Sequence, residues 1–364
     1  MKKRVWFALS LTLLLALTAC GGGNTSTGST STSNGSASAQ NQTENQAQNQ
    51  AQNQEAAATQ YPLTIVNYTK AEGGTEWKEK EQVFDKAPER IMANTRPAAE
   101  FLLHLGLGDK IVGVGANFGA PDPAVEEEYN KLNILSDGYV GKEVTLGTDP
   151  DLVFGRGGLF ENADWGVGTV DVLNDMGINT YVLESSITGG TYESVYKDIE
   201  NLGKIFNVQD KANAFIQELK ARQEVISTKL AGITEKKTFA LLFMSDPNEV
   251  SVYAAHAESF FNDAFHMVKL ENVFENNSSD EVSVESLIGA DPDVLIVPDW
   301  RTYDGSDPNT LKEALYNNPK LSNMKAIKNK QIYAVDYNYM FGYGYNTIDG
   351  MEQLAKEMYP DLFK

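Results

Sequence analysis

Cysteine, histidine and basic residues are all scarce in this chain of 364 residues. It has one cysteine and three histidines, and 50 acidic residues outnumber 30 lysines and arginines, which gives a net charge of −20. A single cysteine excludes an internal disulfide, so packing alone must stabilise the core. Three scattered histidines do not supply the converging ligands of a dedicated zinc or manganese site. The negative charge argues against binding to nucleic acid and against electrostatic adhesion to anionic lipid.

Signature motifs of common enzymes are also missing. The body contains no G-x-S-x-G elbow, no H-E-x-x-H pair and no cysteine nucleophile. Gly155, Gly157 and Gly158 resemble a phosphate-binding loop only superficially, because no P-loop lysine follows them. We therefore expect a protein that is not an enzyme and has no intrinsic cofactor. A surface hydrolase on an α/β scaffold stays open as a rival, and loss of activity on replacing one acid would support it.

The longest apolar run lies at the start of the chain. Residues 2–4 are basic, residues 5–17 are mostly apolar but short for a transmembrane helix, and L-T-A-C follows at 17–20. This ending resembles the lipobox of bacterial lipoproteins, in which a peptidase cuts before the cysteine and lipid is attached to its sulfur. We expect lipidation at Cys20. The alternative is an ordinary secretory signal with a chance cysteine.

A polar segment follows the expected signal peptide. Residues 21–60 are almost entirely Gly, Ser, Thr, Asn, Gln and Ala, a composition that cannot bury enough surface to offset its conformational entropy. We expect a disordered tether that lets the body move above a membrane. The expected organisation is a signal peptide at 1–20, the tether at 21–60, a first lobe at 61–188, a helical bridge at 189–235 and a second lobe at 236–364.

The body alternates short apolar runs with helical patterns, which predicts parallel sheets covered on both faces. Pro97 suits the first turn of a helix. Residues 192–233 form a helical stretch, with a break expected near 207–210. Strands are expected at 90–93, 111–114, 152–154, 180–183, 239–244, 250–253, 294–297 and 332–335, and a closing helix at 347–358.

One nine-residue pattern, E-x-x-x-G-x-D-P-D, occurs twice. The copies run from Glu143 to Asp151 and from Glu285 to Asp293, which is 142 residues apart (285 − 143), and each leads into an apolar strand. This spacing is far longer than the period of a solenoid repeat. It predicts one α/β unit used twice, in two similar lobes.

These residues resemble a known family. The resemblance rests on A-P-E-R-I at 87–91, A-A-E at 98–100, D-K-I-V-G-V at 109–114 and the two D-P-D turns. The body is similar to the class III periplasmic binding proteins, which are substrate-binding lipoproteins of ABC importers for iron-siderophore complexes, haem and cobalamin. The resemblance implies two α/β lobes joined by a long helix, with the ligand in the cleft between them and only small motion on binding.

The resemblance also assigns a role to the two leading glutamates. In the family, a glutamate seven residues before the proline of each such turn pairs with arginines of the membrane permease, and Glu143 and Glu285 hold these positions. Two carboxylates on two similar lobes suit a permease built from two like subunits, and arginine binds a carboxylate bidentately. The alternative is that each glutamate only favours the start of a short helix.

The ligand cleft should be lined by loops at the carboxyl ends of the strands. Arginines there suit the oxygens of anionic ferric chelates, and aromatic side chains offer flat apolar contact. The alternative is that the arginines form salt bridges and the tyrosines pack under loops. The expected ligand-binding residues are Arg96, Phe118, Arg156, Trp165, His256, Trp300, Arg301, Tyr339 and Tyr343.

We expect two of the three histidines to be structural and the third to face the cleft. His104 and His266 lie in helical patterns, so we expect structural roles, whereas His256 is in a loop that should face the cleft. We expect no metal bound directly by the protein. If haem were the cargo, His256 or a cleft tyrosine would be the axial ligand.

The sequence thus predicts a lipid-anchored, extracytoplasmic, monomeric receptor that delivers a ferric siderophore to an ABC importer permease dimer. Iron is expected only as part of the bound chelate, and membrane contact only through the lipid. The long tether suits a Gram-positive surface. Haem, cobalamin or another corrinoid is the alternative cargo, and a sensory or adhesive lipoprotein without a transporter is a further alternative.

Overall fold

The computed structural model describes residues 58–364. The lipidation expected at Cys20 and nearly all of the tether therefore lie outside the described residues. Within residues 58–364, none of the helices combines the length and the apolar character needed to cross a membrane.

The first lobe is built on a four-stranded parallel sheet in the order β4-β3-β5-β6. Helix α2 begins where the sequence predicts, because the Thr95 side chain accepts a hydrogen bond from the Ala98 amide and Pro97 lies in the first turn. The strands are β3 (Ile91–Ala93), β4 (Ile111–Val114), β5 (Leu152–Gly155) and β6 (Asn179–Val182). The helices are α2 (Arg96–His104), α3 (Glu126–Tyr129), α4 (Lys142–Gly147) and α5 (Val170–Asp175), with 3-10 turns η1 (Gly108–Lys110), η2 (Gly157–Leu159) and η3 (Glu184–Ser186).

An antiparallel hairpin that the sequence analysis did not anticipate packs beside this sheet. It consists of β1 (Leu63–Lys70) and β2 (Trp77–Phe84). The side chain of Asn67 donates to the Val182 carbonyl at 2.9 Å and accepts from the Val182 amide at 2.8 Å. This side chain therefore satisfies backbone groups of β6, which is the edge strand of this sheet within residues 58–364.

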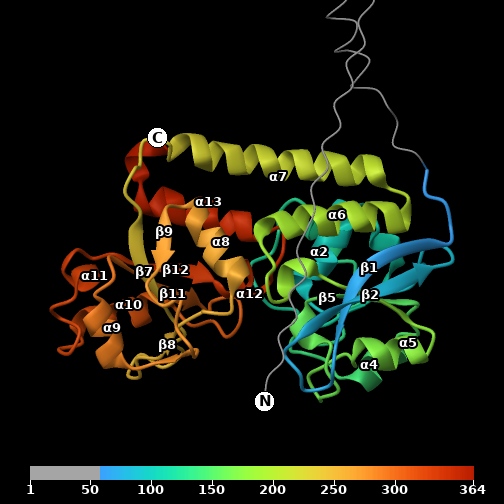
Figure 1. Ribbon diagram of the computed structural model, residues 1–364, viewed down its shortest axis with the longest axis horizontal. Helices are drawn as coiled ribbons and strands as arrows, with labels where there is room; N and C mark the ends of the chain where they lie inside the picture. Colours follow the sequence, from blue (N-terminus) through green and yellow to red (C-terminus); the bar gives the residue numbers. More distant parts are fainter. Residues whose placement is uncertain (1–57) are drawn as a thin grey trace, which may run out of the picture. The chain divides into compact units, whose positions relative to one another are not determined.

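Two long helices follow the first lobe. Helix α6 (Tyr192–Phe206) ends at Asn207, which adopts the left-handed conformation with φ 55°, and α7 (Gln209–Lys229) starts two residues later. The break expected near 207–210 is thus confirmed. In Figure 1, α6 lies over the first lobe and α7 runs on from it to the second lobe, so α7 is the bridge.

The second lobe holds a six-stranded sheet in the order β10-β8-β7-β11-β12, with β9 also paired to β7. Strands β9, β7, β11 and β12 are parallel, but β8 and β10 are antiparallel, so this sheet is mixed where a parallel one was expected. The strands are β7 (Lys237–Leu242), β8 (Val252–Tyr253), β9 (Leu270–Asn272), β10 (Glu281–Val282), β11 (Val294–Asp299) and β12 (Ile332–Asp336). The helices are α8 (Ser259–Met267), α9 (Val284–Ala290), α10 (Pro308–Asn317), α11 (Lys325–Lys328), α12 (Tyr337–Phe341) and α13 (Thr347–Met358), followed by the 3-10 turn η4 (Pro360–Leu362).

The repeated nine-residue pattern has the same structure in both lobes. Each copy forms a short helix, α4 or α9, and the first aspartate of each D-P-D is left-handed, with φ 51° at Asp149 and 45° at Asp291. The Asp151 carboxylate accepts from the amides of Glu89 and Arg90, just before β3. The Asp293 carboxylate accepts from the Thr238 amide and hydroxyl on β7. The prediction of two similar α/β lobes is confirmed.

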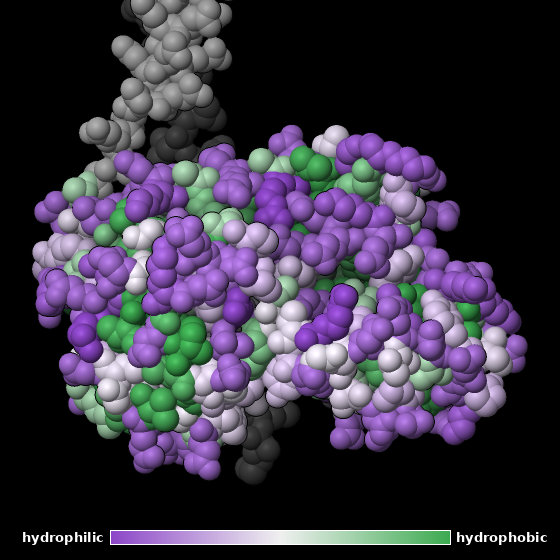
Figure 2. All heavy atoms as spheres, turned by 180° about the vertical axis from the view of Figure 1, so that it is seen from behind, coloured by the Kyte–Doolittle hydropathy of each residue, from purple (hydrophilic) through white to green (hydrophobic). Residues whose placement is uncertain are grey.

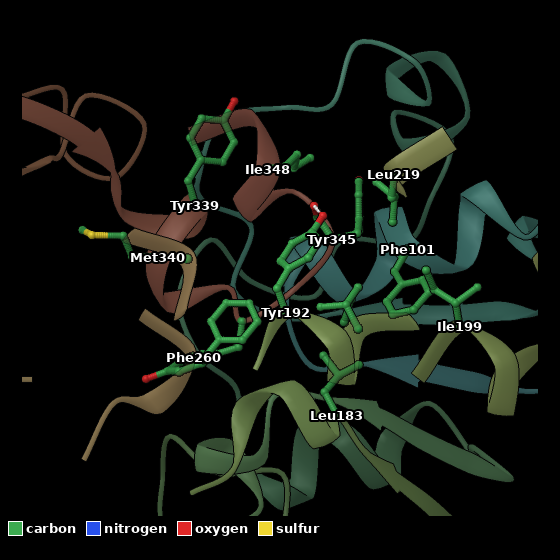
Figure 3. Close-up of a cluster of buried hydrophobic side chains, with 14 of the residues drawn as sticks. Phe101, Leu183, Tyr192, Ile199, Leu219, Phe260, Tyr339, Met340, Tyr345 and Ile348 are labelled. Carbon is green, nitrogen blue, oxygen red and sulfur yellow. Dashed lines mark hydrogen bonds between the residues drawn. The ribbon is translucent and has the colours of Figure 1, made fainter. Parts of the chain in front are cut away.

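One apolar cluster extends across both lobes (Figure 3). The ring of Tyr345, from the second lobe, lies 6.0 Å from Phe101 and 5.2 Å from Phe215 of the bridge. Its carbonyl accepts a hydrogen bond from the Tyr192 hydroxyl at 2.9 Å. The surface is different in character: hydrophilic residues cover most of the face in Figure 2.

Candidate functional site

Arg156 follows β5 directly, at the carboxyl end of the first sheet, and its backbone is held firmly. The Asn94 side chain accepts from the Arg156 amide at 2.9 Å and donates to its carbonyl at 3.0 Å. Gly155, with φ 140°, permits this approach, since a Cβ there would lie 1.9 Å from the Asn94 oxygen. The sequence therefore fixes the position of the Arg156 main chain without using its side chain.

The Arg156 guanidinium projects among tyrosines of both lobes. It lies 5.0 Å from the ring centroid of Tyr343, and Nη1 is 3.5 Å from the Tyr139 hydroxyl. Burial works against the charge, but the nearby oxygens of Tyr343, Tyr337 and Tyr139 more than offset it, so the pKa of Arg156 is raised. The guanidinium thus stays charged, and its polar contacts are with the hydroxyls of Tyr139 and Tyr337, which engage only part of its five N–H donors.

Aromatic rings continue from Arg156 along the seam between the lobes. Tyr337 stacks on Trp300 at 5.1 Å, and its hydroxyl is 3.4 Å from that of Tyr139 in the first lobe. Phe118, which follows β4, makes edge contacts with Tyr303 at 4.9 Å and with Tyr139 at 5.4 Å. We call this set the aromatic cleft, after the ligand cleft that the sequence analysis expects between the lobes: Phe118, Tyr139, Arg156, Phe243, Trp300, Tyr303, Tyr337, Phe341 and Tyr343.

Part of the aromatic cleft is open to solvent. Phe243 is 40% exposed and Tyr303 is 55% exposed. Trp300 is nearly buried, because its Nε1 donates to the Met244 carbonyl at 2.6 Å while its ring faces Tyr337. An apolar or aromatic molecule entering the cleft would therefore meet Phe243 and Tyr303 first.

Glu258 holds two tyrosines in place, Tyr343 of the aromatic cleft and Tyr253 on β8. It accepts from the Tyr343 hydroxyl at 2.9 Å and from the Tyr253 hydroxyl at 2.8 Å. Burial raises the pKa of Glu258, and the hydrogen bonds from both tyrosines oppose that rise. Sequence reasoning missed Glu258 and Tyr139, since both lie in segments without periodicity or a motif.

Several of the residues expected to bind ligand lie elsewhere. Arg96 is engaged inside the first lobe, with Nη1 at 3.2 Å from Glu100, Nη2 at 3.2 Å from Asn117 and its guanidinium 4.1 Å from the ring of Tyr129. Trp165 is 49% exposed and has no ring contact with the aromatic cleft among the described residues. For Arg96, the structure favours the alternative of a salt bridge.

Arg301 and Tyr339 line a different hollow, of about 390 Å³, that also includes Asp336. Arg301 is bound by its neighbour Asp299, whose carboxylate accepts from Nε at 3.0 and 2.9 Å. His256 contacts Asp280, with Nδ1 2.9 Å from the carboxylate. The structure therefore brings together Phe118, Arg156, Trp300 and Tyr343. The other five expected residues are not part of this set: Arg96, Trp165, His256, Arg301 and Tyr339.

Comparison with known proteins identifies this architecture. Residues 92–339 match the family described as periplasmic binding protein, which is more than half of the chain. The chain belongs to the periplasmic binding protein family. Its members are non-enzymatic substrate-binding proteins of ABC transporters, so the predicted absence of catalysis is confirmed and the hydrolase rival is set aside.

Three similar proteins illustrate the range of this family. The chain is 26% identical over 283 residues to the uncharacterized ABC transporter substrate-binding lipoprotein YvrC of Bacillus subtilis, covering 77% of this chain and 82% of YvrC. It is 24% identical over 213 residues to the vitamin B12-binding protein of Vibrio parahaemolyticus, covering 57% and 70% of the two chains. The crystal structure of an ABC-type Fe3+-hydroxamate transport system from Saccharomonospora viridis matches with a TM-score of 0.64 at 24% identity, covering 82% of this chain and all of the other.

The two glutamates of the repeat occupy matching positions in this periplasmic binding protein. Glu143 lies in the first turn of α4 and Glu285 in the first turn of α9, and both are exposed. Figure 1 shows α4 and α9 on the side of the body away from α7. A hollow of about 280 Å³ adjoins Glu143 and includes Val144 and Asp164. Two separate carboxylates are thus presented on one side of the protein.

The histidines offer little for metal binding. His104 contacts Asp122 at 2.7 Å and stacks on Phe215 at 4.4 Å, and His266 lines a groove of about 470 Å³ between α7 and α8. Across residues 58–364, no group of three or more His, Cys, Asp or Glu side chains is placed to hold a metal ion.

Proposed function

We propose that this substrate-binding protein is a lipid-anchored extracytoplasmic receptor that captures a ferric siderophore and delivers it to the permease of an ABC importer. The observation that carries the proposal is Arg156, a single guanidinium held between two lobes among tyrosine hydroxyls and aromatic rings. A ferric siderophore presents oxygen atoms, is frequently anionic and has broad apolar faces. Arginine binds such oxygens through a planar fork of donors, and aromatic rings bind the faces.

Haem, cobalamin or another corrinoid is the alternative cargo. The vitamin B12-binding relative supports a corrinoid, and the Fe3+-hydroxamate neighbour supports an iron chelate. Arg156 favours the anionic chelate. His256 is bonded to Asp280 through Nδ1, which leaves Nε2 open, so this histidine does not decide between the two cargoes. Only tyrosine hydroxyls among the described cleft residues would be available to ligate haem iron.

Delivery depends on the two exposed glutamates. We place Glu143 and Glu285 against arginines of a two-subunit permease, since bidentate Arg–carboxylate pairs give both affinity and orientation. Their equivalent places on α4 and α9 support this role. The protein acts as a monomer, because one body with two docking points already matches a twofold partner.

The anchor and the cargo complete the proposal. Lipid on Cys20 retains the receptor at the outer face of the cytoplasmic membrane, as on a Gram-positive surface, and the lipoprotein name of YvrC supports this anchor. There is no resident cofactor and no metal ligated by the protein. Iron arrives and leaves inside the chelate.

Ligand titration tests the cargo. The purified protein is mixed with ferric siderophores, haem and cobalamin, and binding is followed by tryptophan fluorescence. Trp300 stacks in the cleft, so Trp300→Phe should remove most of the quenching, whereas the matched control Trp165→Phe should retain it. Binding of haem or cobalamin with no response to any ferric siderophore would reject the proposed cargo, and the absorption spectrum of the complex would identify the replacement.

A further inference from the structure

A buried polar chain runs from α6 to the segment of the second lobe that carries Tyr343. It passes from the Asp198 carboxyl through the Ser185 hydroxyl to the Tyr343 carbonyl. Asp198 is 0% exposed and Ser185 is 1% exposed, so water does not reach either side chain. Tyr343 belongs to the aromatic cleft, where its ring lies 5.0 Å from the Arg156 guanidinium. The chain therefore connects an acid outside the cleft with a residue inside it.

The backbone of Tyr343 adopts a conformation that needs support. Its φ is 49°, in the left-handed region, which costs free energy for a residue other than glycine. Its carbonyl accepts from the Ser185 hydroxyl at 2.6 Å, and its side-chain hydroxyl donates to Glu258 at 2.9 Å. Ser185 of the first lobe thus holds the main chain of a cleft residue from the second lobe, beside the ring contact with Arg156.

The number of hydrogens on Ser185 restricts the state of Asp198. Ser185 Oγ lies 2.6 Å from the Tyr343 carbonyl oxygen and 3.1 Å from Asp198 Oδ2. A carbonyl and an ionised carboxylate can only accept, and a serine hydroxyl carries one hydrogen. The shorter contact takes that hydrogen, because 2.6 Å is a strong O–H···O distance. Both contacts are full hydrogen bonds only if Asp198 Oδ2 carries a hydrogen of its own and donates it to Ser185.

The other contacts of Asp198 are compatible with this proton. Oδ1 accepts from the Tyr181 hydroxyl and from the Glu184 amide, both at 3.0 Å, as the carbonyl oxygen of a carboxylic acid would. Oδ2 accepts from the Ser185 amide at 3.2 Å, and an acid hydroxyl keeps a lone pair for such a bond. The protonated form therefore satisfies every contact that the carboxyl group makes.

The charges around Asp198 also favour the protonated form. Glu184 of η3 is a second acid that faces it, and Lys197 pairs with Glu184 at 2.5 Å. Tyr68 of β1 and Tyr181 of β6 are the other titratable groups nearby, and burial raises the pKa of both. Burial raises the pKa of Asp198 to about 7, although hydrogen bonds from the backbone of η3 and from Tyr181 oppose the rise. The proton is therefore retained below this pH and lost above it.

We propose that Asp198 and Ser185 are positioning residues for the ligand site: Asp198, as a carboxylic acid, donates to Ser185, which donates to the Tyr343 carbonyl. When the proton leaves Asp198 for water, the carboxylate accepts the Ser185 hydrogen and the Tyr343 carbonyl loses its donor. A buried carbonyl without a donor is destabilising, so Tyr343 is then held less firmly and the cleft binds its ligand more weakly. The effect on binding rests on the proposed function, because it requires a cargo that contacts Tyr343.

Infrared spectroscopy of the purified protein tests the proton. The carbonyl stretch of a carboxylic acid is separate from the bands of carboxylates and amides, and difference spectra against Asp198→Asn isolate Asp198 from other buried acids such as Glu100. The band should be present at about pH 6 and absent at about pH 8. It should shift in Ser185→Ala, which removes the group to which the acid donates. A missing band at the lower pH, or a band that Ser185→Ala leaves in place, would overturn the proposal. If Asp198→Asn does not fold, ¹³C labelling of aspartate carboxyls identifies the band and the shift in Ser185→Ala decides.

Hydrogen–deuterium exchange measures the hold on Tyr343 without a ligand. Asp198→Asn keeps a donor but cannot titrate, so wild type and variant are compared at the same pH and the intrinsic pH dependence of exchange cancels. Between about pH 6 and about pH 8, exchange of residues 342–347 in the wild type should become roughly fivefold faster relative to the variant, the effect of one lost hydrogen bond. Asp171→Asn, which alters an exposed carboxylate paired with Lys80, is the matched control and should follow the wild type at both pH values. A constant ratio between wild type and Asp198→Asn would refute the positioning role.

Ligand titration then separates this inference from the proposed cargo. The probe is an uncharged ferric trihydroxamate, which has no group that titrates between the two pH values. Its Kd for the wild type should weaken about fivefold from the lower to the higher pH, and its Kd for Asp198→Asn should stay the same. An unchanged Kd for the wild type would refute the effect on the cleft. If the chelate does not bind at either pH, the proposed cargo fails, while the infrared and exchange experiments still decide the proton and its hold on Tyr343.

Discussion

Replacing Arg156 should separate charge recognition from the rest of the binding site. The side chain contacts the Tyr139 hydroxyl at 3.5 Å, is hydrogen-bonded to Tyr337 and lies 5.0 Å from the ring of Tyr343, so part of its planar fork of donors can still meet a ligand. A bidentate charge-assisted contact contributes about 2–3 kcal/mol, which corresponds to a roughly 30- to 150-fold weaker Kd for an anionic chelate in Arg156→Ala. Arg156→Lys keeps the charge but loses the planar fork, so its loss should be smaller, about tenfold.

The assay is fluorescence titration with two ferric chelates of similar size, one anionic and one neutral. The fold should persist, because Asn94 holds the Arg156 backbone and not its side chain, and circular dichroism checks this. Weaker binding of the anionic chelate alone supports direct recognition. Undiminished binding of the anionic chelate by Arg156→Ala, or an equal loss for both chelates, would refute the reasoning.

Three further predictions concern docking, the repeat and a buried acid. Glu143→Ala combined with Glu285→Ala should abolish uptake in cells and leave Kd unchanged, because both side chains are exposed outside the cleft; normal uptake would contradict the docking role. Asp151→Ala and Asp293→Ala should each lower the free energy of unfolding by about 1–3 kcal/mol, measured in urea melts. The reason is that each carboxylate accepts two hydrogen bonds from the start of a neighbouring strand. A loss below about 0.5 kcal/mol would show that these hydrogen bonds do not contribute to stability. Burial raises the pKa of Asp198 to about 7, above the ordinary 3.8, so its protonation stabilises the fold and that contribution disappears as pH rises from about 4 to about 7. The penalty of Asp198→Asn should therefore shrink across this window, and a constant penalty would contradict the shifted titration.

The strands and the long helices could be predicted because their apolar periodicity matches burial. The closing helix was expected at 347–358 and α13 spans Thr347–Met358. The β1–β2 hairpin could not be predicted in the same way. Its second strand, W-K-E-K-E-Q-V-F, is mostly polar. The hairpin packs on the lobe through a few apolar side chains, Ile65 and Phe84 among them, and is joined to the sheet edge by the amide side chain of Asn67.

For the candidate site, the position of a residue after a strand predicted where its backbone lies, but it did not predict which groups its side chain contacts. Arg156 was expected because it follows a core strand, and it does reach the cleft. Arg96 also follows a strand, but Glu100 lies four residues later on the same helical face and binds it. That spacing is visible in the sequence and could have predicted the salt bridge. Tyr139 and Glu258 are brought to the cleft only by tertiary packing.

The placement of Tyr345 has a consequence for synthesis. Its ring fills the space between Phe101 of the first lobe and Phe215 of the bridge, and its hydroxyl donates to Asp122 at 2.7 Å. The first lobe is contiguous in sequence and emerges from the ribosome early, yet its apolar seam is completed only by the last twenty or so residues of the chain. During synthesis and export, the apolar surface around Phe101 therefore stays exposed until the C-terminal segment that contains Tyr345 has been made and can pack against it. A chain truncated before α13 should therefore fail to fold and be bound by chaperones or degraded by proteases. It should not persist as a folded receptor with lower affinity for its ligand.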